Sequence, residues 1–430
     1  MPVIDTTTRT TGEAETRLSR ERTPSVAAAL LLPLVDRIPV MAAPCRMHAS
    51  IDRITVSLAE WTREVGLETP APARFDRMAG RAFAGFGTDS TLLFAKWLTW
   101  LFHFDDEWDE KPAGRAAGIV EAAFARLARH TAETAVPCGG AVQETQDARA
   151  GGRTGAGTAR TATVRPKPPA SVQARGSSPL QARNRPLQPK GLPGLQARAA
   201  APRPEGVLPV EVAFRDLWGV TAPRMSPRWR ERFTRGLAAQ GVACRTEAEN
   251  RCAGRVPSVA EYPALRRGTA GPYLFDLVEP CLGVEVPAEL RESPAWRTLV
   301  DACNDVTAWC NDVASHHKER ANGDVHNYVT VAAHAFGLSD TEAVGWVNDR
   351  IAERAEDLRA AARRMPGLFD EFGLSPVQAR NASKVACAFL AAPRAQLEWL
   401  LESSRYDLTS SACLKAGDSN STYPARGKTC

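Results

Sequence analysis

Apolar side chains recur at steps of three and four residues through most of the chain, and this spacing is the strongest constraint on its fold. One such stripe consists of Ile51, Ile54, Leu58 and Trp61, and a stronger one runs through residues 90–108. Because an α-helix turns once in about 3.6 residues, these steps place the apolar side chains on one face. Alternating runs of β-branched residues are few. The pattern predicts an all-α fold in which each helix buries one face.

The same spacing locates the remaining helices. They are expected at about residues 118–135, 210–220, 227–243, 258–267, 273–282, 294–320, 339–365 and 375–403. Together with the two stripes above they predict one helical domain over residues 36–408.

Changes in composition mark the parts outside this domain. Residues 138–205 are dominated by Gly, Ala, Pro, Arg, Gln and Ser, and include a Pro-Lys-Pro-Pro run at 166–169 that excludes regular helix or sheet. Such a segment cannot bury enough apolar surface to offset its ordering entropy, so we expect a disordered insertion in a surface loop. Residues 1–35 are expected to form a disordered N-terminal arm, and the polar residues 409–430 a flexible tail.

The net charge of +5 originates in the expected insertion. Residues 138–205 contain eleven Lys or Arg against three Asp or Glu, so they carry +8 and leave the other residues at −3. A mildly acidic domain argues against a nucleic-acid partner. No apolar run approaches the about 18 residues of a membrane span, and the ten cysteines form no CxxC pair. We expect a cytoplasmic protein with reduced cysteines and no stable membrane association.

A cluster of acids ends the strongest predicted helix, in the run Phe104-Asp105-Asp106-Glu107-Trp108-Asp109-Glu110. Asp105 and Asp109 are four residues apart and therefore share a face. Acids at the C-terminal end of a helix repel one another and oppose the macrodipole, and a divalent cation removes both penalties. Mg²⁺ prefers carboxylate oxygens and substrate phosphates. Taken alone, the cluster is also compatible with a solvated acidic helix end.

A second polar stripe lies on the helix expected at residues 294–320. Asn311, Ser315 and Glu319 follow at i, i+4 and i+8. Each four-residue step rotates by about 40°, so the three oxygens stay on one side. An amide, a hydroxyl and a carboxylate can form an all-oxygen Mg²⁺ site, and Lys318 beside them can pair with a phosphate. The alternative for this stripe alone is a polar outer face.

In combination the two motifs resemble those of the bacterial class I terpene synthases. Asp105-Asp106-x-x-Asp109 resembles their aspartate-rich motif, and Asn311-Asp312-x-x-Ser315-x-x-Lys318-Glu319 their second metal motif. Leu265-Arg266-Arg267-Gly268-Thr269-Ala270-Gly271 resembles the stretch that carries a diphosphate-sensing arginine and a helix break, and Arg405-Tyr406 the arginine–tyrosine pair near the C-terminus. Glu110 adds an acid, so either Asp109 or Glu110 completes the first motif.

The resemblance implies a fold, an activity and a set of site residues. The fold would be a single class I terpenoid synthase-like helical bundle around an apolar cavity. The activity would be that of a Mg²⁺-dependent terpene cyclase of secondary metabolism, a lyase acting on a prenyl diphosphate with three Mg²⁺ ions. Implied metal ligands are Asp105, Asp106, Asp109, Asn311, Ser315 and Glu319. Arg267, Lys318, Arg405 and Tyr406 would bind the diphosphate, and Arg267, Gly271, Arg405 and Tyr406 would act in catalysis.

Side-chain size before the first motif bears on the substrate. Members of the bacterial branch most often resemble sesquiterpene cyclases, and bulky residues would shorten the cavity. We therefore expect C15 farnesyl diphosphate, cyclised to a hydrocarbon or alcohol, with C20 geranylgeranyl diphosphate as the alternative. Candidate wall residues, some of which must by their angle face the core instead, are Phe94, Trp97, Trp100, Leu101 and Trp309.

Two other functions are alternatives to the cyclase. A trans-prenyltransferase would need a second aspartate-rich motif in place of the Asn-Ser-Glu stripe. A non-catalytic binding protein on the same scaffold is disfavoured because every expected ligand position is occupied. A monomer or homodimer is expected.

Overall fold

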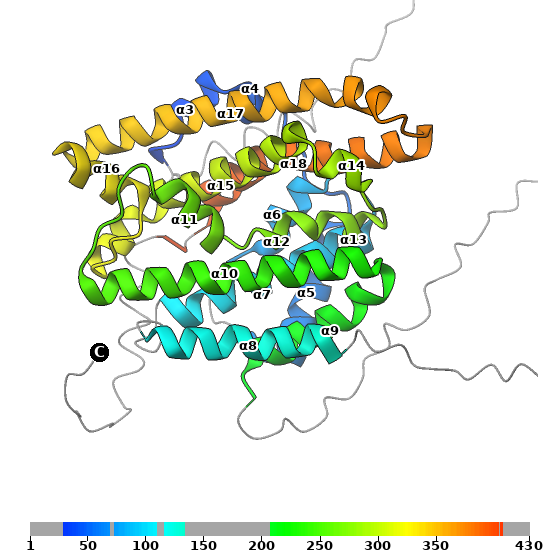
Figure 1. Ribbon diagram of the computed structural model, residues 1–430, viewed down its shortest axis with the longest axis horizontal. Helices are drawn as coiled ribbons and strands as arrows, with labels where there is room; N and C mark the ends of the chain where they lie inside the picture. Colours follow the sequence, from blue (N-terminus) through cyan, green and yellow to red (C-terminus); the bar gives the residue numbers. More distant parts are fainter. Residues whose placement is uncertain (1–28, 69–72, 110–115, 134–206, 404, 407–430) are drawn as a thin grey trace, which may run out of the picture. The chain divides into compact units, whose positions relative to one another are not determined.

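The computed structural model describes residues 29–68, 73–109, 116–133, 207–403 and 405–406 (Figure 1). The expected insertion at 138–205, the expected tail at 409–430 and most of the expected arm lie outside these residues. Within the described residues every regular element is a helix and none is a strand. The all-α prediction is thus confirmed. No helix of the described part combines the length and hydrophobicity needed to cross a bilayer.

The helices precede and follow the gap at residues 134–206. Before it lie α3 (Pro33–Arg37), α4 (Pro39–Ala42), α5 (Ile51–Val65), α6 (Phe75–Ala82), α7 (Thr88–Asp109) and α8 (Ala117–Glu133). After it come α9 (Pro209–Thr221), a 3₁₀ turn (Ala222–Arg224), α10 (Pro227–Ala253), α11 (Tyr262–Thr269), α12 (Tyr273–Asp276), α13 (Val278–Leu282), α14 (Ala288–Arg291), α15 (Pro294–Ala321), α16 (Tyr328–Phe336), α17 (Asp340–Glu371) and α18 (Pro376–Glu402).

The four longest helices begin with the same local device. A serine caps α10, α15, α17 and α18, and its hydroxyl accepts a hydrogen bond from a backbone N–H in the first turn. In three of them proline follows the serine, where its missing N–H costs nothing and its fixed φ suits the helix. These caps define where the four longest helices begin, of which α15 and α18 contribute to the site described below.

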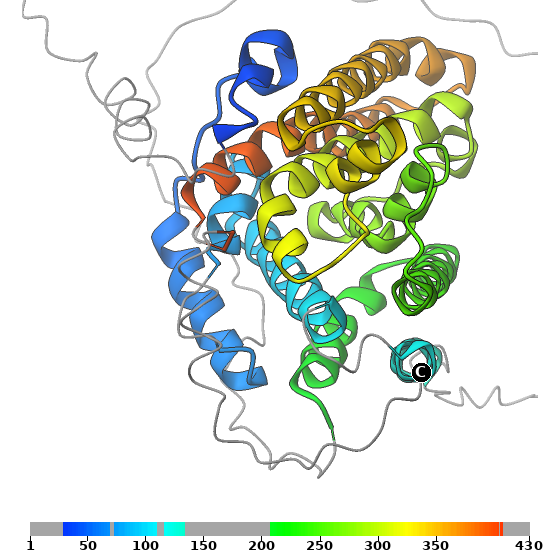
Figure 2. The same ribbon diagram turned by 90° about the vertical axis from the view of Figure 1, so that its left-hand side faces the viewer.

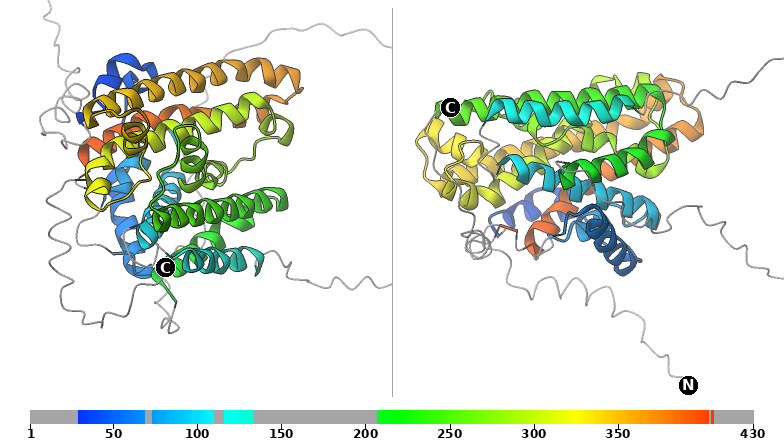
Figure 3. Two further views of the ribbon diagram at one scale, coloured as in Figure 1. Left: turned by 60° about the vertical axis from the view of Figure 1, so that its left-hand side comes forward. Right: turned by 90° about the horizontal axis from the view of Figure 1, so that it is seen from below.

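The hydrophobic core lies between the long helices, which pack in two groups. The helix α15 lies against α17 and α18, and α7 packs against α5, α6, α9 and α13. Figures 1 and 3 show α17 running along α15, and Figure 2 shows α8 and α10 end-on and side by side. Tryptophans and phenylalanines fill the space beside α7, where Trp97 contacts Trp100, Phe214 and Phe233 at ring-centroid distances of 5.5–5.9 Å.

Some element boundaries differ from the sequence expectation. Residues 29–35, predicted to belong to the disordered arm, are ordered because Leu31 and Leu34 are fully buried, so the domain starts before residue 36. The short helices α6 and α16 were not predicted. The helix expected at residues 273–282 is divided into α12 and α13, and α10 runs ten residues beyond its predicted end.

Candidate functional site

An apolar cavity lies among α6, α7, α11, α12, α13, α15 and α18. Its lining is mostly aliphatic and aromatic, with polar side chains from Asp105, Arg266, Thr269, Asn304, Thr307, Asn311 and Gln396. Three of these, Asp105, Arg266 and Asn311, belong to the motifs identified in the sequence. The cavity therefore brings the two predicted motifs to one apolar space.

The helix α7 carries an apolar stripe that ends in the first motif. Phe94, Leu98 and Leu101 line the cavity, and Asp105, four residues further, continues the same face. The neighbouring Asp106 carboxylate accepts two hydrogen bonds from the Arg405 guanidinium, at 2.5 and 3.1 Å. The helix ends at Asp109, whose side chain, like Glu110, lies outside the described residues. The choice between those two acids stays a prediction.

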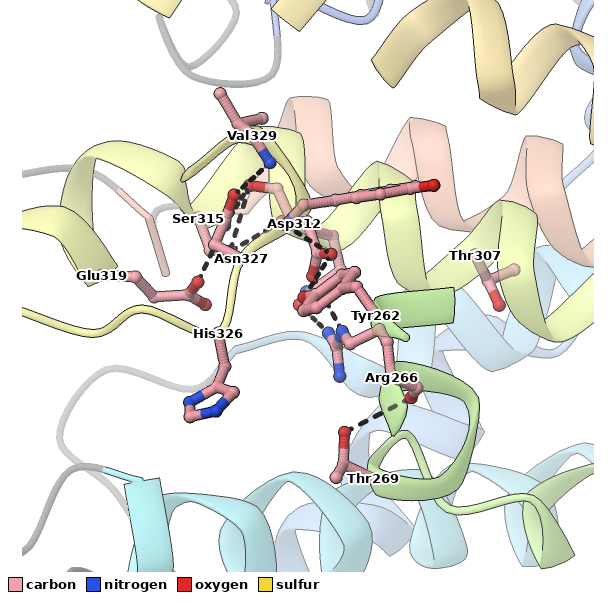
Figure 4. A network of polar contacts seen from close by, with 12 residues as sticks. Tyr262, Arg266, Thr269, Thr307, Asp312, Ser315, Glu319, His326, Asn327 and Val329 are labelled. Carbon is pink, nitrogen blue, oxygen red and sulfur yellow. Dashed lines mark hydrogen bonds and ion pairs between the residues drawn. The ribbon is translucent and has the colours of Figure 1, made fainter. Parts of the chain in front are cut away.

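The helix α15 carries the second motif, drawn in part in Figure 4. Asn311 donates from Nδ2 to the Tyr406 hydroxyl at 2.6 Å and accepts at Oδ1 from Arg266 at 3.0 Å. The Ser315 hydroxyl donates to the Asn311 carbonyl at 2.8 Å, which leaves the lone pairs of Oγ for another partner. Asn327 donates to Glu319 Oε2 at 2.8 Å. The three expected ligands thus lie on one stripe.

The environment of Glu319 favours a positive partner. Burial, followed by the negative charge of Asp312, raises the pKa of Glu319 to about 8, against the hydrogen bond from Asn327. A cation beside this carboxylate would reverse the effect and favour its ionised form. The stripe offers only oxygen donors, which are the donors that Mg²⁺ takes. Its residues therefore fit a hard divalent cation.

The site is not built on a triad of carboxylate, imidazole or thiolate groups. Among the described residues no group of three or more His, Cys, Asp or Glu converges. The reason is chemical, because the second motif replaces two carboxylates by an amide and a hydroxyl. The first motif is only partly described.

Two adjacent arginines on α11 have different surroundings. Arg266 lines the cavity and donates to Asp312 at 2.8 Å and to Asn311 at 3.0 Å. Arg267, the predicted diphosphate sensor, instead forms two 2.8 Å hydrogen bonds with Asp305, which also accepts from Arg354 at 2.7 Å. Arg267 is absent from the cavity lining. Arg266, which the sequence analysis did not select, therefore lines the cavity and Arg267 does not, and the diphosphate-sensing role of Arg267 stays a prediction.

Asp312 explains why the two arginines separate. It is fully buried beside the stripe of expected metal ligands on α15. Besides the bond from Arg266, it accepts hydrogen bonds from Tyr262 at 2.8 Å and from the Tyr328 backbone N–H at 3.2 Å (Figure 4). A buried carboxylate requires such partners. Asn311 and Asp312 thus hold Arg266 at the cavity by hydrogen bonds. Knowledge that α11 contacts α15 at this point could have identified Arg266 from the sequence.

The helix break predicted at Gly271 is present. Gly271 has φ +74° and separates α11 from α12. A Cβ at this position would lie 3.0 Å from Leu101 Cδ1, so both the backbone conformation and the space favour glycine. The Thr269 carbonyl accepts from Gln240 at 2.9 Å, and the Gly271 carbonyl accepts from the Leu274 N–H at 2.9 Å. Ala270, between them, lines the cavity.

The arginine–tyrosine pair connects the two motifs. Arg405 contacts Asp106 of the first motif, and Tyr406 contacts Asn311 of the second. The Arg405 guanidinium also lies 5.1 Å above the ring of Phe102, which lines the cavity. Lys318, half-buried on α15, does not line the cavity. Both members of the pair are therefore placed at the site, and Lys318 lies beside its ligand stripe.

The wall candidates divide between cavity and core, as expected of them as a group. Phe94 and Leu101 line the cavity. Trp97 and Trp100 are fully buried elsewhere, and their indole N–H groups donate to Thr221 and to the Val210 carbonyl. Trp309 packs against Tyr328 at 5.0 Å. Phe83, Phe275 and Phe389, which the sequence argument did not single out, supply further aromatic wall.

Known proteins are similar to this chain in sequence. The family described as "Terpene synthase family 2, C-terminal metal binding" matches residues 192–357, which include α15. The (−)-δ-cadinene synthase of Streptomyces clavuligerus is 26% identical over 365 residues, 83% of this chain and 90% of that protein. The (+)-T-muurolol synthase of Roseiflexus castenholzii, named as cyclising (2E,6E)-farnesyl diphosphate, is 36% identical over 149 residues, 34% of this chain and 43% of that protein.

A solved structure shares the fold. Germacradien-4-ol synthase from Streptomyces citricolor superposes with a TM-score of 0.60 at 20% identity, covering 84% of this chain and 97% of that one. The similarity at this identity concerns the helical architecture, whereas the family match and the relatives concern the sequence. The matched segment includes the helix that bears Asn311, Ser315 and Glu319, so this chain resembles the bacterial class I terpene synthases in the segment that the family description names as metal-binding.

Proposed function

We propose that this enzyme ionises a prenyl diphosphate in the presence of Mg²⁺ and cyclises the resulting carbocation, with release of diphosphate. One observation carries the proposal. A mostly apolar cavity has Asp105, Arg266 and Asn311 in its wall, so a hydrocarbon chain and a charged headgroup can be bound in one space. Solvent is excluded from the chain while the leaving group meets charged partners.

Charge on the leaving group is the central problem of the ionisation. Mg²⁺ ions, three by family resemblance, would neutralise the diphosphate as the carbon–oxygen bond breaks, held by Asp105, Asp106, Asp109, Asn311, Ser315 and Glu319. Arg266 replaces Arg267 in our assignment of the diphosphate-sensing residue. Arg405 is the second arginine, Tyr406 can donate a hydrogen bond, and Lys318 is a further candidate cation. No general base is required for this step.

Shape controls the carbocation after ionisation. Phe83 stacks on Phe94 at 4.5 Å, and Phe275 meets Phe389 edge-on at 5.8 Å. Aromatic faces stabilise a cation without reacting with it. The cavity wall is thus suited to shield a reactive carbocation from bulk solvent.

The same side chains favour farnesyl diphosphate as substrate. Phe94, Leu98, Leu101 and Phe102 are the residues of α7 before Asp105 that line the cavity, and bulky groups there would exclude a C20 chain before a C15 chain. The proposed product is a sesquiterpene. The C20 geranylgeranyl diphosphate is the alternative substrate. We further propose a cytoplasmic monomer or homodimer that binds neither nucleic acid nor membranes.

Direct turnover tests this proposal. The purified chain is incubated with Mg²⁺ and separately with C10, C15 and C20 prenyl diphosphates, and products are identified by gas chromatography–mass spectrometry alongside diphosphate release. Cyclic C15 products and no reaction after chelation of Mg²⁺ are expected. Faster turnover of the C20 substrate would overturn the size argument, and absence of reaction with all three would overturn the activity.

A further inference from the structure

The cavity contains a group of hydrogen-bond acceptors that the ionisation step does not use. Asn304 and Thr307 lie three residues apart on α15, and Gln396 on α18 reaches the same place because its Nε2 donates to the Thr307 carbonyl at 2.8 Å. All three line the cavity, and Asn304 and Gln396 are 2% and 4% exposed. Figure 4 shows Thr307 on α15, apart from the Asp312 network.

Hydrogen bonds fix the orientation of both amides. Asn304 donates from Nδ2 to the Arg267 carbonyl at 3.2 Å, and Gln396 donates to the Thr307 carbonyl. Turning either amide over would set its oxygen against a carbonyl oxygen, so the nitrogen must face the backbone. The oxygens Asn304 Oδ1 and Gln396 Oε1 accept no hydrogen bond from any residue that the structure describes. Buried acceptors without a donor are uncommon in folded proteins.

Thr307 contributes the same chemistry. Its hydroxyl donates backward to the Cys303 and Asn304 carbonyls at 2.9 and 3.0 Å, so only its lone pairs are left for the cavity. One N–H of each amide and the hydroxyl hydrogen of Thr307 therefore donate to backbone carbonyls. The group presents two unpaired amide oxygens and the lone pairs of the Thr307 hydroxyl. The other polar side chains of the cavity wall are Asp105, Arg266, Thr269 and Asn311.

We propose that Asn304, Thr307 and Gln396 bind a water molecule that captures the final carbocation, so that the main product is an alcohol. The inference rests on the proposed cyclase function. Water has two donor hydrogens, which the amide oxygens accept, and a lone pair is left to face the cavity. That lone pair forms the carbon–oxygen bond to the cationic carbon. The oxonium proton passes to the diphosphate anion released in the ionisation, which leaves a neutral alcohol.

Isotope labelling of the unmodified enzyme is the first test. The full chain is incubated with Mg²⁺ and the prenyl diphosphate that it turns over, in H₂¹⁸O, and the products are analysed by mass spectrometry. The expected main product is an alcohol two mass units heavier than that formed in ordinary water. Unlabelled hydrocarbons as the main products would overturn the inference and leave the cyclase function intact, because cyclisation would still have occurred. Absence of turnover would overturn both.

Substitution of the acceptors is the second test. Asn304→Leu and Gln396→Met preserve side-chain size and remove the oxygens, and each should lower the alcohol-to-hydrocarbon ratio about tenfold while diphosphate release continues. Asn348→Leu is the matched control. Asn348 is also buried, donates to the Leu30 carbonyl at 3.0 Å and has an unpaired Oδ1, but it does not line the cavity. An unchanged ratio in both cavity variants, or an equal fall in the control, would contradict the proposal.

Discussion

The cavity walls formed by α7 and α15 differ in kind. The wall from α7 is Phe94, Leu98, Leu101 and Phe102, with a single carboxylate at its end, whereas the wall from α15 is Asn304, Thr307, Ala308 and Asn311. One helix therefore supplies shape and the other supplies placed polar groups. We therefore expect α7 to control the length of the substrate and α15 to control turnover. Substitutions on the two helices should affect these two properties separately.

The largest effect is expected where the two walls meet the diphosphate. Asp105→Ala, Asn311→Ala and Glu319→Ala should each lower diphosphate release by about 10²–10³-fold or more, because each removes a proposed Mg²⁺ ligand. Circular dichroism should stay native. His317→Ala, at an exposed position on α15, is the control and should retain wild-type turnover. Wild-type turnover in a folded ligand variant would remove that residue from the proposed site.

The neighbouring arginines of α11 give the next largest effect and the clearest contrast. Arg266→Gln should reduce turnover by about 10²-fold, because this guanidinium lines the cavity. Arg267→Gln should mainly reduce stability, by about 1–3 kcal/mol, since Asp305 keeps Arg354 as a partner. Steady-state turnover and thermal unfolding of both variants separate the effects. A reversed order would restore Arg267 as the diphosphate-sensing residue.

Smaller side chains in the α7 wall should enlarge the cavity and change the selectivity for substrate length more than the turnover rate. Phe94→Ala and Leu101→Ala should raise the C20-to-C15 turnover ratio several-fold, while lowering stability by about 2–5 kcal/mol. Phe124→Ala is the matched control, because Phe124 is a buried phenylalanine of α8 that does not line the cavity. Competition assays with both substrates measure the ratio. If Phe124→Ala changes it equally, α7 does not set substrate length.

The smallest effect concerns the end of α18, just before Arg405. Burial would raise the pKa of Glu402, but hydrogen bonds and charge from Arg77 and Arg81 outweigh it and hold the pKa at about 2. The pKa of an unperturbed Glu is about 4.3. The interaction of Glu402 with the two arginines should therefore stabilise the fold fully above about pH 4.3, and this contribution should be lost as the pH falls towards about 2. Urea unfolding of wild type and Glu402→Gln should show a difference of about 2 kcal/mol at neutral pH that shrinks over this range. A difference in unfolding free energy that stays constant between neutral pH and about pH 2 would show that the ionisation of Glu402 is not coupled to folding.

The sequence predicted the helices and their functional stripes because both depend on local spacing. Ser315 and Glu319 follow Asn311 by whole four-residue steps, which any helix places on one side. The class of fold and the family followed from these motifs. The start of the ordered domain was missed because Leu31 and Leu34 are buried by tertiary contacts that no local pattern reveals.

Contacts between distant segments were beyond the sequence argument. Arg266 and Arg267 have the same side chain, and only the positions of Asp312 and Asp305 on α15 decide which arginine lines the cavity. Likewise Trp97 and Phe94 are both apolar members of α7, but Thr221 holds the indole N–H of Trp97 on the core side. The unpaired amide oxygens of Asn304 and Gln396 became visible only when their hydrogen-bond partners were known.

The ion pairs between α6 and α18 have a consequence for biosynthesis. Arg81 and Glu402 are separated by 321 residues, and Glu402 joins both Arg77 and Arg81. At ~5–20 residues per second a ribosome needs roughly 15–60 s to add that stretch. During this interval the N-terminal helices lack the partner that closes them, and their apolar faces are open to chaperones or to other nascent chains. The yield of active enzyme should therefore depend on how translation speed compares with chaperone capacity.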